Sequence, residues 1–467
     1  MDNIVSEIVE IINNSPSLID IEMAMETYFT EVFSQLFSKA LERIDLELIQ
    51  EYKEKGFEID RIEERTVQFS FGPVTLKRRR MRKKGEKSVI PLDLAIGLDK
   101  HKRYSPLVEM KAVSLASDSV YRKASDAMEL LTPLSISHGA IHSMTQRLGE
   151  TIQNYTDEAP LHDETPIKDK KKVPVLFIEG DGLLLKGSKE KRPELHRVQI
   201  HEGVIMDHKR PKLKNPFLFE STESSRKAFE RAGKWLEKEY DLRKTIVISN
   251  SDGGSGYERD KFDAIIGQTQ RHEHFRDAYH VNRKIKERLH FDKKMANLMI
   301  RAIHSYNQNQ IEAILHTTLS RIDEDNKEKE ADYIENVYKL EKYIQRNWSS
   351  LKPLRMRTLP VQKGLGVCES NHRPFSYRMK HQGRGFTKKG AGNLAAVISA
   401  RRNGTFLEIL TTRLPAFKEE VTGRFKFAVR NALKKGRVQP SQGAVRGRIA
   451  NYGPTSSPMG RLAGIFK

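Results

Sequence analysis

The chain has 467 residues, with 82 Lys and Arg against 62 Asp and Glu, which gives a formal net charge of +20 and an isoelectric point near 9.7. This length suffices for two to four domains, and the charge favours a polyanionic partner, most simply nucleic acid. A single cysteine, Cys368, excludes an internal disulfide framework and a multi-cysteine zinc site. The sequence offers neither a membrane-spanning apolar run nor the pattern of a signal peptide, so we expect a cytoplasmic protein with no membrane partner.

Residues 1–57 are predicted to form helices. Apolar side chains recur at helical spacing between Ile21 and Tyr52, and polar side chains fill most of the intervals. We expect this apolar face to serve packing or self-association rather than to form a specific binding groove.

Residues 62–83 change to a two-residue period, which predicts a β-hairpin turning at Gly72-Pro73. The second strand runs into seven basic residues within eight positions. Such a run is either a solvated face or a set of phosphate contacts, and the strongly basic chain favours phosphate contacts. The candidate DNA-binding residues in this run are Lys77, Arg78, Arg79, Arg80 and Arg82.

Two helices are predicted on either side of Thr132-Pro133-Leu134, the first ending at Leu131 and the second capped by Ser135 or Ser137. The pair is either a plain helical hairpin or a helix-turn-helix, in which the second helix contacts DNA. The candidate DNA-binding residues on that second helix are His142, Gln146 and Arg147. The polar, proline-broken residues that follow are typical of a linker.

Two apolar runs, 173–180 and 245–249, each lead to a carboxylate followed by glycine, at Asp181 and Asp252. We expect two buried strands that present these carboxylates at their carboxyl ends. Three strands, a helix over 224–240 and a further strand would follow the order of a ribonuclease-H-like fold. Two such carboxylates are a plausible seat for divalent cations acting on nucleic acid.

Beyond this region the chain remains basic. A short strand near His272–Phe275 precedes a helix from Asp277, and we expect the histidines there to contact DNA or support the fold rather than bind metal. Residues 291–352 lack Gly and Pro and predict a helical insertion, and 388–402 predicts a further helix. The candidate DNA-binding residues in these segments are His280, Arg283, Arg378, Lys380 and Arg384.

Together these patterns predict an α+β multidomain protein with a ribonuclease-H-like mixed αβ catalytic domain. The predicted segments are an N-terminal helical region (1–57), a hairpin and helix-turn-helix-like DNA-binding region (58–153), a linker (154–172), the catalytic domain (173–290 and 360–410) interrupted by a helical insertion (291–359), and a basic, partly disordered extension (411–467).

Several short motifs, in this order and spacing, resemble bacterial insertion-sequence transposases of the Lre type, relatives of the Mutator-like DDE transposases. The motifs are Phe71-Gly-Pro-Val-Thr-Leu-Lys-Arg-Arg-Arg, Val120-Tyr-Arg-Lys-Ala, Glu179-Gly-Asp-Gly, Ser251-Asp-Gly-Gly, Asp277-Ala-Tyr-His, and Glu369 with Arg378-Met-Lys downstream. The resemblance covers residues 20 to 410.

The resemblance implies a catalytic and metal-binding triad of Asp181, Asp252 and Glu369. It implies two Mg²⁺ ions, which Mn²⁺ can replace, and hydrolysis and strand transfer at phosphodiesters. Glu179 is the rival carboxylate on the first strand, since a strand would place it on the same face as Asp181. The expected partners are double-stranded DNA, as element ends and target, and further copies of the chain, at least a dimer.

Three functions remain open on these observations. The first is an active DDE-type transposase of a bacterial insertion sequence. The second is a decayed or domesticated DNA-binding protein without catalysis, and the third is a ribonuclease-H-like nuclease without strand transfer. Convergence of the carboxylates would favour the first or the third function.

Overall fold

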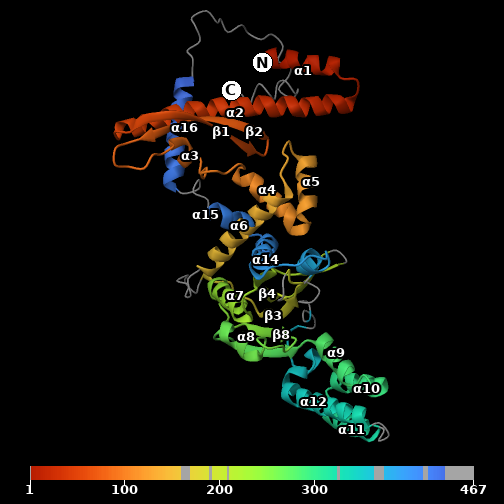
Figure 1. Cartoon of the computed structure of the whole chain (residues 1–467). Coiled ribbons are helices and arrows are strands. Elements are labelled where there is room, and N and C mark those ends of the chain that lie inside the picture. Colours follow the sequence, from red (N-terminus) through yellow and green to blue (C-terminus); the bar gives the residue numbers. More distant parts are fainter. Residues whose placement is uncertain are drawn as a thin grey trace, which may run out of the picture. The chain divides into compact units, whose positions relative to one another are not determined.

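The computed structural model describes residues 2–158, 169–188, 192–207, 210–322, 327–361, 366, 373–413 and 419–436. The chain is a mixed α+β multidomain protein that divides into two compact units (Figure 1). Unit 1 comprises residues 1–35, 66–75 and 100–417, and unit 2 comprises residues 36–65, 76–99 and 418–467. The coarse fold class expected from the sequence is therefore confirmed.

The chain begins with two helices and a β-hairpin. Helix α1 (Asp2–Asn14) precedes the long helix α2 (Leu18–Glu54), and strands β1 (Glu58–Phe69) and β2 (Gly72–Arg82) pair as a two-stranded sheet. Gly72 has a positive φ of 127°, and a Cβ there would lie 2.5 Å from the Thr30 methyl group. The turn therefore needs glycine for its backbone conformation and for its close approach to α2.

Unit 2 contains its own small core. The buried side chains of Ile49, Phe57 and Met81 pack together, joined by the partly buried Tyr52 and Val89. The short helix α3 (Pro91–Ala95) and helix α16 (Glu419–Gly436) belong to the same unit and contact each other.

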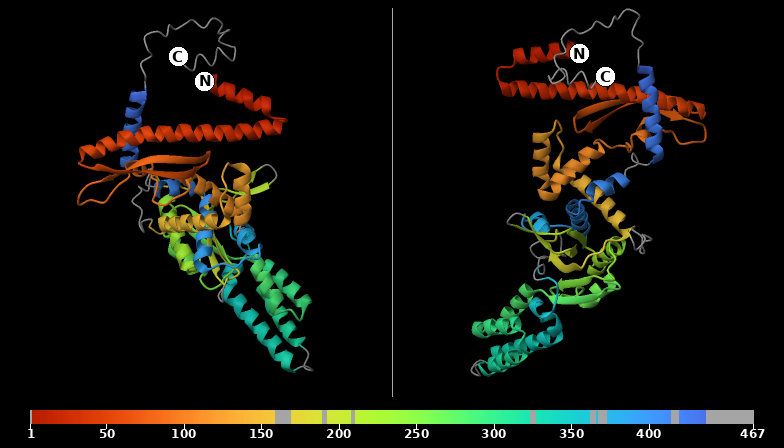
Figure 2. Two further views of the ribbon diagram at one scale, coloured as in Figure 1. Left: turned by 45° about the horizontal axis from the view of Figure 1, so that its top comes forward. Right: turned by 180° about the vertical axis from the view of Figure 1, so that it is seen from behind.

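In unit 1, helices from two distant parts of the sequence share one core (Figure 2). They are α4 (Pro106–Asp118), α5 (Tyr121–Leu131), α6 (His138–Asp157), α14 (Lys388–Arg402) and α15 (Phe406–Arg413). Ser137 is the N-cap of α6, as expected, and accepts a hydrogen bond from the Ala140 amide. Helix α6 continues to Asp157, so the first residues of the predicted linker are helical.

The central sheet of unit 1 has five strands in the order β7-β4-β3-β8-β9. Strand β4 is antiparallel to both β3 and β7, whereas β8 and β9 run parallel to β3. The strands are β3 (Val175–Leu184), β4 (Glu194–His201), β7 (Phe217–Ser221), β8 (Ile246–Ser251) and β9 (Arg271–Arg276). A separate two-stranded sheet is formed by β5 (Val204–Asp207) and β6 (Arg210–Leu213).

Helices cover both faces of this sheet. Helices α7 (Ser225–Glu239) and α8 (Arg259–Ile266) pack on the face that carries Leu176, Ile178 and Val247. Part of the other face packs against α14 and against the short segments α13 (Arg373–Phe375) and η4 (Ser376–Lys380). One strand boundary was predicted wrongly, because β3 continues through Asp181 to Leu184 instead of ending before Asp181.

Helices occupy most of the segment that was predicted to be a helical insertion, 291–359. Helices α9 (Ala278–Arg288), α10 (Lys293–His304), α11 (Gln308–Ser320) and α12 (Lys327–Leu351) enclose a core of their own, and a short 3₁₀ turn, η2 (Leu354–Met356), follows. The predicted disordered tail, 437–467, lies outside the described residues. None of the helices in the described ranges is long and apolar enough to cross a lipid bilayer.

Candidate functional site

Each of three adjacent parallel strands has an aspartate directly after the last residue of its parallel pairing. The register pairs Gly180 of β3 with Ser251 of β8, and Ser251 with Arg276 of β9. The next residue on each strand is an aspartate, so Asp181, Asp252 and Asp277 follow one another across the sheet. Asp181 and Asp252 are the two aspartates that the sequence predicts as the site, and each follows one residue of the registered pair Gly180 and Ser251.

Side-chain alternation assigns Asp181 and Asp252 to one face of the sheet. Gly180 and Ser251 are a registered pair on the α7 and α8 side, where a Cβ on Gly180 would contact Tyr257, and alternation turns the next residue of each strand to the opposite side. Glu179, the rival carboxylate, shares the face of Asp181 but is fully buried, whereas Asp181 and Asp252 are half-buried. Water and phosphate therefore reach the two aspartates more readily than Glu179.

Local backbone hydrogen bonds hold each carboxylate. Asp181 Oδ1 accepts a hydrogen bond from the Gly182 amide at 2.7 Å, and Asp252 Oδ1 accepts one from the Gly254 amide at 2.8 Å. Gly253 has a positive φ of 78°, and a Cβ there would lie 2.3 Å from Arg276 Nη1. Gly253 therefore lets the backbone turn closely after Asp252 and leaves room for Arg276.

The electrostatic environment of the site is acidic. Burial raises the pKa of Tyr257, and the charges of Glu194, Asp181 and Asp252 raise it further. The Tyr257 hydroxyl also lies 2.9 Å from His196 Nδ1. Both candidate carboxylates thus contribute to the raised pKa of one buried tyrosine.

One arginine supplies positive charge beside Asp252. Arg276 Nη1 donates to Ser251 Oγ at 3.1 Å, and Arg276 Nε donates to Asn347 Oδ1 at 2.8 Å. Burial lowers the pKa of Arg276, while the charge of Asp252 opposes that shift. Asn347 belongs to α12, so the helical insertion orients a cation at the site. Sequence reasoning missed Arg276, whose position just after a β-strand beside the acids was the available signal.

The third aspartate has a structural task. Asp277 is the N-cap of α9, and its Oδ1 accepts hydrogen bonds from the Tyr279 and His280 amides. Its Oδ2 accepts a hydrogen bond of 3.3 Å from Asn250 Nδ2. Asp277 therefore fixes the start of α9, as the sequence predicted, and links it to the strand that carries Asp252.

Glu369, the third acid of the predicted triad, lies outside the described residues, as does Cys368. Among the residues that the structure describes, no three His, Cys, Asp or Glu side chains converge to hold a metal ion. Asp181 and Asp252 nevertheless fit a divalent cation of the Mg²⁺ type, because such ions are bound through one or two carboxylates together with water and substrate phosphates.

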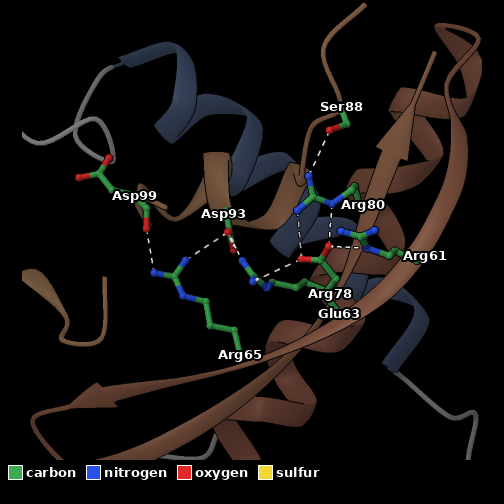
Figure 3. Close-up of polar contacts among 8 residues, drawn as sticks. All are labelled: Arg61, Glu63, Arg65, Arg78, Arg80, Ser88, Asp93 and Asp99. Atoms are coloured by element: carbon green, nitrogen blue, oxygen red, sulfur yellow. Dashed lines mark hydrogen bonds and ion pairs between the residues drawn. The ribbon is translucent and has the colours of Figure 1, made fainter. Parts of the chain in front are cut away.

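Arg78 and Arg80 of the basic run form intramolecular ion pairs (Figure 3). Arg78 is 8% exposed, and its Nη1 donates to Asp93 Oδ2, which also accepts from Arg65 Nη1 at 3.3 Å. Arg80 Nε donates to Glu63 Oε1 at 2.7 Å, and the charge of Arg80 helps to lower the pKa of Glu63 to about 2. Arg78 therefore joins the hairpin to α3, and Arg80 links the two strands of the hairpin.

The remaining members of the run differ in exposure. Arg79 Nη1 donates to Oδ2 of the fully buried Asp45 at 2.8 Å, which ties β2 to α2. The side chains of Lys77 and Arg82 are 54% and 70% exposed, and the carboxylate oxygens that pair with them lie 3.8 and 3.9 Å from their nitrogens. Of the five candidate residues in this run, Lys77 and Arg82 are therefore the most open to a phosphate.

Helix α6 uses much of its predicted DNA-reading surface for packing. Gln146 Oε1 accepts a hydrogen bond of 3.0 Å from Asn393 Nδ2 on α14. Arg147 Nη2 lies 2.5 Å from Oε1 of the buried Glu109. His142 is exposed and packs edge-on against Tyr121. DNA binding by His142, Gln146 and Arg147 stays a prediction; His142 and Arg147 are exposed, and Gln146 is half-buried.

The other candidate DNA-binding residues also divide by burial. Lys380 and Arg384 are exposed, and Arg283 is exposed with Glu287 as an ion-pair partner at 2.7 Å. His280 is half-buried at the start of α9. Arg378 is almost fully buried, and its Nε donates to the Ala116 carbonyl at the end of α4.

Other acidic and histidine side chains in this part of the chain have protein partners. Glu202 pairs with Lys171 and with Lys214. His272 Nε2 and His274 Nδ1 each lie 2.7 Å from the buried Ser249 Oγ. Glu273 pairs with Arg357 at 2.6 Å, and the Asp207 side chain lies outside the described part of the chain.

Comparison with known proteins identifies the family. The model of an uncharacterised protein family, UPF0236, matches residues 11–411. The chain belongs to this family. A UPF0236 protein from Streptococcus gallolyticus, "in vanSb 3'region", is 41% identical over 98% of this chain and 99% of its own length. A UPF0236 protein from Caldanaerobacter subterraneus is 24% identical over 67% of this chain and 62% of its own length.

These matches correct the family resemblance drawn from the short motifs. The assignment to insertion-sequence transposases of the Lre type, related to Mutator-like DDE transposases, is wrong, because the matching family is uncharacterised and these relatives carry only UPF0236 names. Short motifs such as Glu179-Gly-Asp-Gly span only a few residues, so they indicate a local structure rather than a family.

Proposed function

We propose that this UPF0236 protein catalyses metal-dependent cleavage and strand transfer at DNA phosphodiesters, as a transposase does. One observation carries the proposal: Asp181 and Asp252 follow directly from a registered residue pair on adjacent parallel strands and share one face of the sheet. The high positive charge of the chain supports a nucleic-acid substrate.

The strand order supports a ribonuclease-H-like fold for the central sheet. The first three strands in sequence, β3, β4 and β7, form an antiparallel meander, and β8 and β9 extend the sheet in parallel on the other side of β3. In such an arrangement the first and fourth strands of the sheet are neighbours, which brings the carboxylates at their ends together. The two-stranded insertion β5–β6 lies between β4 and β7 in the sequence without changing this order.

Different residues of the chain have different roles at the site. Asp181 and Asp252 would hold two Mg²⁺ ions, or Mn²⁺ in their place, and such ions activate a water or a 3′-hydroxyl and stabilise the leaving oxygen. Arg276, held by Asn347, offers a cation beside Asp252 for a phosphate oxygen. The exposed Lys380 and Arg384 supply further backbone contacts along the DNA.

The name of one relative supports mobility of the gene. The UPF0236 protein of Caldanaerobacter subterraneus has a name that joins eleven separate gene designations from one strain. A protein encoded at many positions of one genome is what an element that copies or moves its own DNA would leave behind. This favours strand transfer over hydrolysis alone, and hence a transposase over a ribonuclease-H-like nuclease.

The test is a Mg²⁺-dependent assay of the full chain on a duplex that carries the DNA flanking its own gene. We expect cleavage and joined products with the unaltered chain, and a loss of at least a hundredfold in Asp181→Asn and in Asp252→Asn. Asp260→Asn is the matched control, because this carboxylate lies on α8 with its side chain 68% exposed and is paired only with Lys261. DNA affinity should be unchanged in all three variants.

Each outcome separates the alternatives. Cleavage without joined products would favour a nuclease. Binding without cleavage in the unaltered chain would favour a DNA-binding protein that has lost catalysis. If Asp181→Asn or Asp252→Asn cleaves as fast as Asp260→Asn, the assignment of the site to these two carboxylates is wrong.

A further inference from the structure

The first part of the chain is a helical arm with an uncovered apolar surface. We define the arm as residues 2–35, which form α1 and the first half of α2. No side chain between residues 4 and 35 is buried, although both helices are rich in large apolar residues. Amphipathic helices normally bury such a face against another element. Among the described residues, no other element covers the apolar side of the arm.

The exposed apolar side chains form one broad stripe on each helix. Successive residues of an α-helix are 100° apart, and on each helix these positions fall within about 140° of one another. They are Ile4, Val5, Val9 and Ile12 on α1 and Leu18, Ile19, Met23, Phe29 and Phe33 on α2, each 39–70% exposed.

The size of this surface suits a specific interface. The nine residues leave on the order of 900 Å² exposed, and each partner in an interface of standard size buries roughly 800 Å². Contiguous apolar patches larger than a few hundred Å² on a folded protein mark interaction sites. The arm is therefore large enough to hold a stable partner by itself.

Contacts within the chain fix the arm without covering the stripe. Helix α1 turns back over α2 (Figures 1 and 2), and a side-chain hydrogen bond with Glu7 on α1 raises the pKa of Tyr28 on α2. Thr30 and Ser34 approach Gly72 at the hairpin turn. Both contacts involve side chains other than those of the stripe, so the stripe stays open.

The charge of the arm sets a condition on its partner. Residues 1–35 contain seven Asp and Glu and no Lys, Arg or His, so the arm carries −7 while the remaining chain carries +27. Two arms brought together repel each other at low salt. At physiological salt the screening length is about 8 Å, so acids on the flanks of the stripe are largely screened while the apolar faces remain in contact.

We propose that the arm is a homodimer interface, in which the apolar stripe of one chain packs against the same stripe of a second copy. The stripe is self-complementary, as a two-fold interface requires, because it is apolar throughout and offers an apolar partner of equal size. This inference does not depend on the chemistry proposed at Asp181 and Asp252.

The test is sedimentation velocity of the full chain at low and high salt. We expect a dimer whose dissociation constant falls several-fold between 0.1 M and about 0.5 M KCl, because salt screens the repulsion between the acidic arms. Ile19→Glu combined with Phe33→Glu should weaken the dimer at least a hundredfold. The matched control is Leu130→Glu with Leu131→Glu, which are 83% and 70% exposed at the end of α5 and should leave the dimer intact.

Three results would overturn the proposal. They are a monomer at both salt concentrations, a dimer that survives the Ile19 and Phe33 substitutions, and a dimer that weakens as salt rises, which would mean that the acidic arm binds a basic surface. If the substituted chain fails to fold, hydrogen exchange of the unaltered chain decides. Protection of amides 4–35 must then rise with protein concentration, and concentration-independent exchange contradicts the interface.

Discussion

Replacing Arg78 by alanine tests whether the basic run of the hairpin is part of the fold or part of a DNA contact. Arg78 is 8% exposed, and its guanidinium lies between Asp93 and Glu63. Removing one partner of a buried ion pair costs about 3 to 5 kcal/mol, because the other charge is left without compensation. Arg65 still pairs with Asp93 in the variant, so we expect the lower end, about 3 kcal/mol.

Native-state hydrogen exchange measures this loss on the hairpin itself. A loss of about 3 kcal/mol corresponds to a drop of roughly a hundredfold in the protection of the β2 amides, if those amides exchange through opening of the hairpin. Lys77→Ala is the control, because its side chain is 54% exposed and its carboxylate partner is 3.8 Å away. Lys77→Ala should change protection less than about threefold, since exposed pairs contribute little.

DNA binding should be affected by Lys77→Ala and not by Arg78→Ala, the reverse of the effect on hairpin protection. If Lys77 contacts a phosphate, Lys77→Ala lowers the slope of log affinity against log salt by about one. Arg78→Ala, assayed under conditions where the hairpin is folded, should leave that slope unchanged. A structural role for Arg78 is contradicted if Arg78→Ala keeps its hairpin protection and lowers the slope of log affinity against log salt as Lys77→Ala does, because Arg78 would then be a phosphate contact.

Two further predictions concern stability. Burial raises the pKa of Asp45 to about 6, so its folded-state pKa lies above the unfolded value and its ionisation destabilises the fold as pH rises from about 4 to 6. The free energy of unfolding of Asp45→Asn, measured with urea, should therefore rise by roughly 2 to 3 kcal/mol relative to that of the unaltered chain across that window. A difference in unfolding free energy that stays constant with pH would show that Asp45 does not titrate there. Glu63, with a pKa of about 2, titrates below this window. Gly149→Ala places a Cβ 2.2 Å from the Asn393 carbonyl oxygen and should lower the urea midpoint by the equivalent of about 3 kcal/mol. The control is Gly139→Ala, which has no atom within 4 Å of its new Cβ and should be neutral or stabilising. Equal midpoints for the two variants would contradict the close packing of α6 on α14.

Much of the local structure could be read from the sequence. Alternating apolar residues around Gly72-Pro73 predicted the hairpin. Ser137 was one of two predicted caps of α6, and helices were predicted to begin at 224 and near Asp277, the residues that cap α7 and α9. These features are encoded by residues within a few positions of one another, since turns and caps depend on local dihedral angles and local hydrogen bonds. The positions of Asp181 and Asp252 near the ends of apolar strands were also visible.

The neighbourhood of the two aspartates could not be read in the same way. Arg276 reaches the site because β9 pairs with β8, and Asn347 reaches it because α12 returns to the sheet 71 residues later. Neither residue stands beside an aspartate motif in the sequence. Their role follows from strand pairing and helix packing, which bring together residues that no local pattern connects.

The sequence by itself determined the helices, the hairpin, the strand that carries each aspartate and the excess of positive charge. Only the tertiary structure decided which charges are available to a ligand. Arg78 and Arg79 look alike in the basic run beside Lys77, yet they find buried carboxylates at Asp93 and Asp45, which lie 15 and 34 residues away. A buried charge must be paired, so the positions of distant acids, rather than the basic run, decide which cations remain free for phosphate.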